Sequence, residues 1–359
     1  MGAECIYSGL VREYMAKTLP MIDAEPPQAC PRAASRPRIA LLSNPKSTGN
    51  IAQLPRIRAY CADHPDLFHY EVEHADQIGE AMKVIARVRP KVLAINGGDG
   101  TVQAALTELH NGGHFGDEPP PVAVLPSGKT NLVAIDLGAR GDPIEALERL
   151  IEVAQGDLEP YIVTRELIAL RRGGDTEDRP VIGLFLGGAR LAETMLYCRE
   201  KIYPLGLPNS VAHVIAAFAG FMKLFLGLKA DFLPPDTKPL SLSLSDDRDQ
   251  LHGRFSLLMV TTLEKVLMSM HLGDRRQGAL KLLAVEDRPD TVLGAFVASV
   301  AGRLGRRRMR GVHFEQADEI VISGDSSELI LDGETFRAEI GRPIHLRTAL
   351  PLSFVKLAA

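Results

Sequence analysis

The sequence predicts an α/β domain with a parallel sheet, followed by an antiparallel β-sandwich domain. Two observations carry this prediction. From Arg38 onward, short apolar runs alternate with helical patterns, which is typical of a parallel sheet with right-handed crossovers. After about Leu158 the segments become short and β-like and are separated by Gly, Asp and Pro, which favours a sandwich or a barrel. A chain of 359 residues is long enough for two such domains.

The predicted elements of the first domain alternate between strands and helices, except that no helix is predicted between the first two strands. We predict strands over Ile39 to Leu42, Phe68 to Glu73, Val92 to Ile95 and Val122 to Leu125. We predict helices over Ala75 to Val88, Thr101 to His110 and Pro143 to Gln155. The first of these helices places Ile78, Met82 and Ile85 on one face, as an amphipathic helix does. The last begins with Asp142 as a capping residue and Pro143 in the first turn.

The second domain is predicted from segments with β-like composition. These are Tyr161 to Leu170, Val181 to Leu186, Leu240 to Leu244, Phe255 to Thr261, Leu280 to Val285, Glu319 to Ile322 and Leu329 to Leu331. Two helical stretches, Val211 to Leu228 and Thr291 to Leu304, interrupt them. Residues 1–36 end in a run of Pro and small residues and are expected to be a variable tail. The predicted divisions are therefore 1–36, 37–157 and 158–359.

Composition excludes several classes of protein. The chain is 45% hydrophobic and 24% charged, which is close to the globular average and argues against wholesale disorder. Its formal net charge of −4 gives no electrostatic case for nucleic-acid binding. The four cysteines form no C-x-x-C pair, so neither a zinc site nor a disulfide framework is expected. With no secretory signal recognised, we expect a cytoplasmic protein.

The strongest functional signal is a glycine-rich turn between a predicted strand and a predicted helix. It reads Asn96-Gly97-Gly98-Asp99-Gly100-Thr101. Glycines let the backbone approach phosphate oxygens, and a helix N-terminus offers free N–H groups and positive potential. A carboxylate among phosphates is repulsive unless Mg²⁺ lies between them, so Asp99 indicates a nucleotide with a metal ion. The plain structural alternative is a tight turn that needs Asp and Gly for its geometry.

Two further turns follow predicted strands. One reads Asn44-Pro45-Lys46-Ser47-Thr48-Gly49 and the other Pro126-Ser127-Gly128-Lys129-Thr130-Asn131. The second ends like a P-loop, but Ala123 stands where that motif requires its first glycine, so we reject a P-loop. Ligands of open α/β sheets bind at the carboxyl ends of the strands, so the three turns predict one nucleotide-binding crevice.

The order and spacing of these turns resemble the diacylglycerol kinase catalytic domain, whose superfamily includes bacterial lipid kinases, sphingosine kinases and ceramide kinases. The matching motifs are Asn44-Pro45-x-Ser47-x-Gly49, Gly97-Gly98-Asp99-Gly100-Thr101 and Pro126-x-Gly128-x-x-Asn131. The central glycine turn is also shared with NAD kinases and phosphofructokinases, which implies a fold of that type. The resemblance implies that ATP binds at the three turns and that Asp99 is the residue that contacts Mg²⁺.

A later motif extends the resemblance. Leu331-Asp332-Gly333-Glu334 is similar to the family's Asp-Gly-Glu motif, in which the glutamate is the proposed general base. By position, Glu334 inherits that role, and a carboxylate suits it because it can accept the proton of an acceptor hydroxyl. The plain alternative is a hairpin turn, which Asp-Gly also favours.

Three departures from the family pattern bear on activity. Lys129 replaces the usual Thr, and Leu132 replaces an Asp that follows Asn131 in many relatives. An ammonium group at Lys129 would stabilise charge on the transferring phosphoryl group; the alternative is a surface lysine. Residues 275–282 lack the aspartate cluster that holds a structural Mg²⁺ in bacterial relatives, so we expect no structural metal.

The sequence thus predicts an ATP-dependent lipid kinase that phosphorylates a hydroxyl of diacylglycerol or of a related lipid such as a sphingoid base. The alternatives are a kinase of a soluble substrate, as in NAD kinase, and a catalytically silent nucleotide- or lipid-binding protein, for which Leu132 is the main support.

Two stretches point to a lipid acceptor at the inner membrane face. Val211 to Leu228 is mostly apolar, but its 18 residues are at the lower limit for spanning a membrane, and Lys223 within it makes spanning costly. We therefore expect this helix on or near the acceptor cleft or packed in the β domain. The second helical stretch runs into five arginines: Arg303, Arg306, Arg307, Arg308 and Arg310. Each would contribute about 1 kcal/mol at an anionic surface, unless they form only a solvated helix end.

Overall fold

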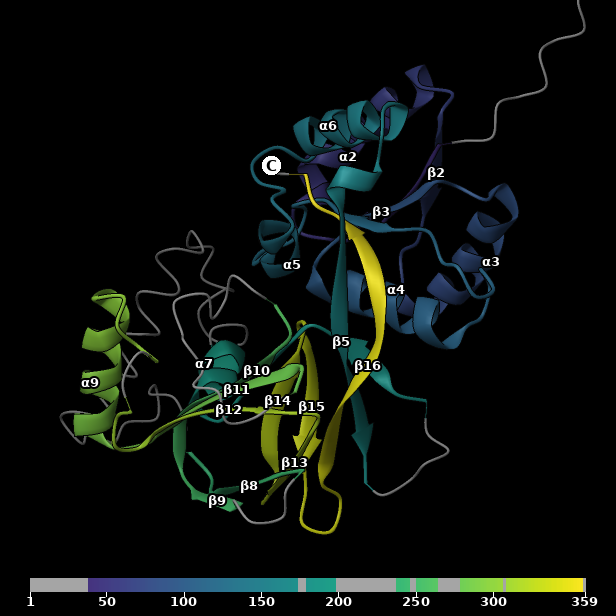
Figure 1. Ribbon diagram of the computed structural model, residues 1–359. Helices are drawn as coiled ribbons and strands as arrows, with labels where there is room; N and C mark the ends of the chain where they lie inside the picture. Colours follow the sequence, from purple (N-terminus) through teal and green to yellow (C-terminus); the bar gives the residue numbers. More distant parts are fainter. Residues whose placement is uncertain are drawn as a thin grey trace, which may run out of the picture. The chain divides into compact units, whose positions relative to one another are not determined.

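The computed structural model of the chain describes residues 38–173, 179–197, 237–245, 250–263, 278–305 and 308–357, which fall in one compact unit, residues 37–359 (Figure 1). The predicted tail of residues 1–36, the helical stretch Val211 to Leu228 and the arginines Arg306 and Arg307 lie outside the described residues. So do residues 275–277 of the segment for which we expect no structural metal.

The first half forms a parallel sheet with strand order β2-β1-β3-β4. Its elements are β1 (Ile39–Ser43), α2 (Asn50–Asp63), β2 (Leu67–Glu71), η1 (Ala75–Gln77), α3 (Ile78–Val88), β3 (Val92–Asn96), α4 (Asp99–Asn111), β4 (Val122–Val124), α5 (Leu132–Asp136), α6 (Pro143–Gln155) and η2 (Glu159–Tyr161). Every residue of β1, β3 and β4 is buried, which explains why these strands read as continuous apolar runs. The predicted strands and helices are confirmed, including Asp142, whose carboxylate accepts a bond from the Ile144 N–H at 2.8 Å.

The second half is largely antiparallel. Its elements are β5 (Ile162–Arg172), β6 (Val181–Gly183), β7 (Phe185–Gly188), α7 (Arg190–Tyr197), β8 (Leu240–Leu244), β9 (Gln250–Gly253), β10 (Phe255–Thr261), β11 (Leu280–Glu286), α9 (Pro289–Val300), β12 (Val312–Ala317), β13 (Glu319–Gly324), β14 (Ser327–Leu331), β15 (Glu334–Ala338) and β16 (Ile344–Val355). One sheet of the described chain has the order β12-β11-β10-β7-β14-β15. Its inner face shares a buried core with β8, β13 and β16, so the predicted class, a parallel α/β part followed by an antiparallel sandwich, is confirmed.

The long strand β16 joins the two halves. Near its start, Ile344 pairs with Ile322 of β13 and Arg172 of β5, both antiparallel. Near its end, Phe354 pairs with Val122 of β4 in parallel. Figure 1 shows β5 and β16 running side by side from one part to the other. The parallel sheet therefore continues directly into the antiparallel one.

Two predicted elements need correction. The segment Val181 to Leu186 is not one strand, because it divides into β6 and β7, which belong to different sheets. The helix predicted over Thr291 to Leu304 runs from Pro289 to Val300 instead. It ends there because Gly302 adopts a left-handed conformation (φ 62°) and the N–H groups of the next two residues turn back to the Ala298 carbonyl.

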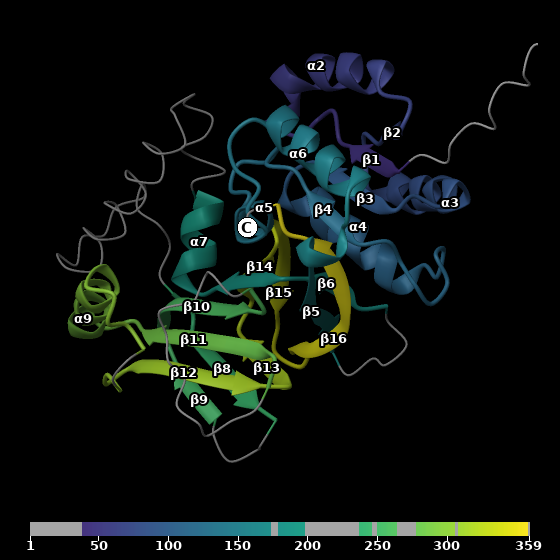
Figure 2. The same ribbon diagram turned by 45° about the horizontal axis from the view of Figure 1, so that its top comes forward.

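Helices α7 and α9 pack against the six-stranded sheet (Figure 2). Helix α7 contacts β10, β7 and β14, whereas α9 contacts β11. Within the ranges that the structure describes, no helix combines the length and apolar character needed to cross a membrane.

Candidate active site

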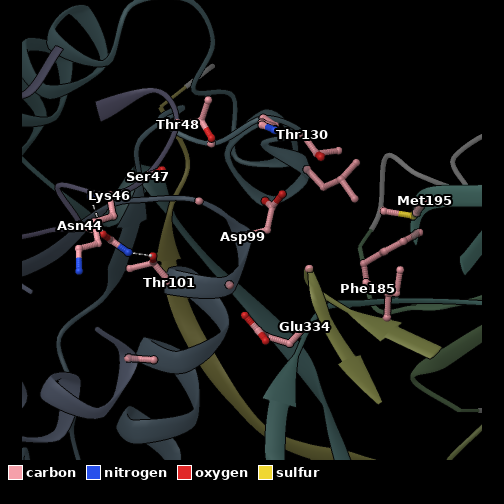
Figure 3. A pocket seen from close by; sticks show the side chains of 18 of the residues that line it. Asn44, Lys46, Ser47, Thr48, Asp99, Thr101, Thr130, Phe185, Met195 and Glu334 are labelled. Carbon is pink, nitrogen blue, oxygen red and sulfur yellow. Dashed lines mark hydrogen bonds between the residues drawn. The ribbon is translucent and has the colours of Figure 1, made fainter. Parts of the chain in front are cut away.

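One cleft of about 650 Å³ brings the four predicted motifs together (Figure 3). Its polar lining consists of Asn44, Lys46, Ser47, Thr48, His74, Gly98, Asp99, Gly100, Thr101, Gly128, Lys129, Thr130, Gly333 and Glu334, of which His74 was not predicted. The turns lie together because each follows one of the adjacent parallel strands β1, β3 and β4. Asn44 links two of them, since its side-chain amide donates to the Thr101 hydroxyl at 2.9 Å.

The other predicted site residues do not line the cleft. They are Gly49, Asn96, Gly97, Pro126, Ser127 and Asn131. Ser127 and Asn96 are fully buried, and the Ser127 hydroxyl donates to the Asn96 side-chain carbonyl. The Ser47 hydroxyl donates to the Ser127 carbonyl at 2.7 Å, and the Asn131 side chain accepts from the Gly128 N–H at 2.7 Å. Most of these six residues therefore hold the three turns in position and do not face the cleft.

The turns also pack backbone against backbone, which requires glycine. A Cβ atom on Gly49 would lie 2.5 Å from the Ser127 carbonyl oxygen. A Cβ atom on Gly128 would lie 2.9 Å from the Cα atom of Gly98. Side chains at these positions would push the turns apart.

The Gly49→Ala variant is expected to unfold at a lower urea concentration than the wild type. The added methyl group meets backbone atoms that cannot rotate away, and such overpacking costs roughly 1 to 3 kcal/mol. Gly156→Ala is the matched control, because its Cβ atom would have only ordinary contacts, the nearest at 3.7 Å. Equal midpoints for the two variants would contradict the close packing of the turns.

Asp99 begins α4, and its carboxylate accepts bonds from the backbone N–H groups of Asn131 and Leu132. Burial raises the pKa of Asp99 to about 6, and these two bonds only partly offset that effect. The first residues of α5 are thus tied to the glycine turn through Asp99.

The Asp-Gly turn does two things at once. Asp332 and Gly333 both have positive φ (43° and 93°) between the paired residues Leu331 and Glu334, as in a two-residue hairpin. The same turn brings Glu334 to the start of α4, where a Cβ atom on Gly100 would lie 2.7 Å from Glu334 Oε1. The turn is therefore a two-residue hairpin, and this geometry is compatible with a role for Glu334 in the cleft.

Asp332 is a residue whose importance the sequence did not reveal. Its carboxylate accepts bonds from the N–H groups of Leu184 and Phe185, at 2.7 and 3.0 Å, where the chain passes from β6 to β7. Burial raises its pKa to about 7, and the negative charge of Asp99 also raises it. Asp332 therefore fixes the hairpin that carries Glu334 against the rest of the site.

The apolar wall of the cleft was also not predicted. The wall formed by the second half consists of Phe185, Leu191, Met195, Leu196, Met259 and Ile330, whereas Val72, Ala75, Ile78 and Leu132 are apolar residues of the first half that also line the cleft. Phe185 and Met195 lie across the cleft from the glycine turn (Figure 3). Those from the second half belong to β7, α7, β10 and β14, so no local pattern unites them.

The donor set of the cleft fits Mg²⁺ only in part. In the described segments, no three His, Cys, Asp or Glu side chains form a cluster that could hold a metal ion by themselves. Mg²⁺ commonly binds through one or two carboxylates and substrate phosphates, and Asp99 can supply such a carboxylate. The site therefore fits a magnesium ion that arrives with a nucleotide.

Comparisons with known proteins agree with this geometry. Two solved structures from Bacillus anthracis str. Sterne, each named as a candidate diacylglycerol kinase, share the fold: they are 17% and 16% identical to this chain, with TM-scores of 0.56 and 0.57. Each comparison covers 90% of this chain and 98% of the other. No curated protein sequence gives a significant match. Residues 38–161 match the family model of the diacylglycerol kinase catalytic domain, and the resemblance inferred from the three turns is thereby confirmed.

Proposed function

We propose that the protein is an ATP-dependent lipid kinase, which phosphorylates a hydroxyl of diacylglycerol or of a related lipid at the inner membrane face. The observation that carries this proposal is the division of the cleft. Glycine turns suited to phosphates form one wall, apolar side chains form the other, and Glu334 lies at the glycine turn with the apolar wall across the cleft. A phosphate donor and an apolar acceptor could therefore meet beside a carboxylate.

The chain's own residues have separate tasks in this proposal. The turns and the N-terminus of α4 bind the phosphates of ATP through backbone N–H groups. Glu334 accepts the hydroxyl proton as the acceptor oxygen bonds to the γ-phosphorus and the bond to the β-phosphate oxygen breaks, which releases ADP. Lys129 stabilises the charge on the transferring group. Asp99 would hold Mg²⁺, which when bound neutralises phosphate charge.

Phosphate transfer from labelled ATP tests the proposal. The acceptors are mixed micelles containing diacylglycerol, micelles containing a sphingoid base, and a soluble alcohol such as NAD⁺. We expect product in a micelle assay and none with NAD⁺. ATP binding without transfer to any acceptor would favour a silent protein, for which Leu132 in the cleft is the supporting observation.

The Lys129→Thr variant is expected to lower kcat roughly a hundred- to a thousandfold, with a much smaller rise in the KM for ATP. The reason is that the charge on the phosphoryl group is greatest in the transition state, so removal of a stabilising group acts mainly on kcat. Lys83→Thr, an exposed lysine on α3 outside the cleft, is the control. An unchanged rate in Lys129→Thr would make Lys129 a surface residue only.

A further inference from the structure

Helix α9 has an apolar face that the described parts of the chain leave exposed. Leu293, Phe296 and Val297 are 48%, 65% and 58% exposed, and their spacing of three and four residues places them on one side of the helix. The opposite side carries Ala295, which packs with Leu283 and Val285 of β11. A helix that is apolar on both sides is normally buried on both sides, so the outer face of α9 indicates a binding surface.

Positive charge lies directly beside this face. Arg303, Arg308 and Arg310 are exposed and follow the end of the helix. Met309, which lies between Arg308 and Arg310, packs against α9, because its methyl group would lie 3.3 Å from a Cβ atom on Gly294. The only acidic side chain of α9, Asp290, is paired with Arg288 at the other end. An anionic partner would therefore meet cations at the C-terminal end of α9.

The apolar cluster beneath α9, on the side opposite the exposed face, shares a residue with the cleft. Met259 of β10 lines the cleft, and it also packs against the apolar cluster beneath α9. Helix α7, which contributes Leu191 and Met195 to the apolar wall, contacts the same strand. The apolar wall of the cleft and the apolar cluster that packs beneath α9 therefore meet at Met259 of β10.

We propose that α9 docks the protein on an anionic membrane, with Leu293, Phe296 and Val297 inserted among the lipids and Arg303, Arg308 and Arg310 at the headgroups. An apolar helix face flanked by arginines is the chemistry that binds the interface of an anionic bilayer. The inference builds on the proposed lipid kinase function, because docking here would place the apolar wall of the cleft close to a membrane-held acceptor. The observations on α9 that support docking, and the vesicle-binding test below, do not depend on catalysis.

Vesicle co-sedimentation without nucleotide tests the apolar part. We expect the wild type to bind vesicles of phosphatidylcholine and phosphatidylglycerol in equal parts, and Phe296→Gln/Val297→Gln to bind at least about tenfold more weakly. The matched control is Ile340→Gln/Leu350→Gln, which removes two more exposed apolar side chains (81% and 76%) elsewhere and should bind like the wild type. Glutamine is a good helix former, and equal urea midpoints will show that α9 remains folded.

A second pair of variants tests the charge. Arg308→Gln/Arg310→Gln should weaken binding about fivefold per arginine at low salt, and the difference should shrink as salt is raised. The control is Arg87→Gln/Lys91→Gln, two exposed cations in the first half of the chain. Vesicles of phosphatidylcholine alone should not distinguish Arg308→Gln/Arg310→Gln from the wild type.

Three results would overturn the proposal: no binding of the wild type to anionic vesicles, wild-type binding by Phe296→Gln/Val297→Gln, or a dimer in solution that this variant dissociates. The last would assign the face to a second copy of the chain. Phosphate transfer to a water-soluble short-chain diacylglycerol should be equal in wild type and α9 variants. If the wild type fails in that assay but binds vesicles through α9, only the proposed kinase function is contradicted.

Discussion

The Asp99→Asn variant is expected to lose phosphate transfer and, without ligands, to be more stable than the wild type above pH 6. Loss of transfer follows from the proposed function, because a neutral amide cannot replace the carboxylate that would hold Mg²⁺ at the phosphates. The gain in stability follows from the pKa, which burial raises to about 6 from an ordinary 3.8. Ionising this group therefore costs the folded state on the order of 3 kcal/mol, and the amide avoids that cost.

The sign of the pH dependence makes this prediction specific. The stability contributed by the carboxyl groups of Asp99 and Asp332 is fully present below about pH 4 and is lost as the pH rises through about 6 and 7. Thermal unfolding of wild type and Asp99→Asn should therefore coincide near pH 4 and separate as the pH rises to 8. Addition of ATP with Mg²⁺ should raise the melting temperature of the wild type more than that of the variant. Near wild-type turnover in Asp99→Asn would contradict the proposed contact with Mg²⁺.

The Glu334→Gln variant is expected to lower kcat by roughly a hundred- to ten-thousandfold, the range typical for loss of a general base, with ATP binding almost intact. Glutamine keeps the size of the side chain at the start of α4 but cannot accept the hydroxyl proton.

Glu339→Gln is the matched control for this variant. Glu339 is an exposed glutamate that follows β15 and does not line the cleft, so its loss should leave turnover unchanged. Calorimetric titration with ATP separates binding from chemistry. If Glu334→Gln loses ATP affinity as strongly as turnover, Glu334 acts in holding the nucleotide and not on the acceptor.

The local signals in the sequence were sufficient for most of the fold. The buried runs around Leu41 and Leu93 and the capping pair Asp142 and Pro143 specify their elements by local chemistry. Helix α2 was not predicted, because it contains Pro55 and follows a turn rich in loop-forming residues. The break at Leu184 between β6 and β7 depends on a carboxylate 148 residues away in the chain, which no local pattern can reveal.

The candidate site likewise contains residues that the local sequence reveals and residues that only the tertiary fold brings together. Each turn that we propose to bind phosphate is contiguous in sequence, because one short loop supplies several N–H groups. Asp99 and Lys129 could therefore be identified from the sequence directly. The apolar wall is assembled from side chains such as Phe185, Met195 and Met259, each of which reads as ordinary core. Asp332 was visible in the Asp-Gly-Glu motif, but its burial beneath the β6–β7 junction is a tertiary property.

The pairing of β16 with β4 has a consequence for the order in which the protein is made. Until residues 344–355 leave the ribosome, β4 is the edge of the parallel sheet, with unpaired N–H and carbonyl groups. The β15 hairpin that carries Glu334 is translated before that edge is covered. A nascent chain therefore completes its parallel sheet only after it has made every motif of the cleft. A chain released early would carry an exposed strand edge that favours aggregation.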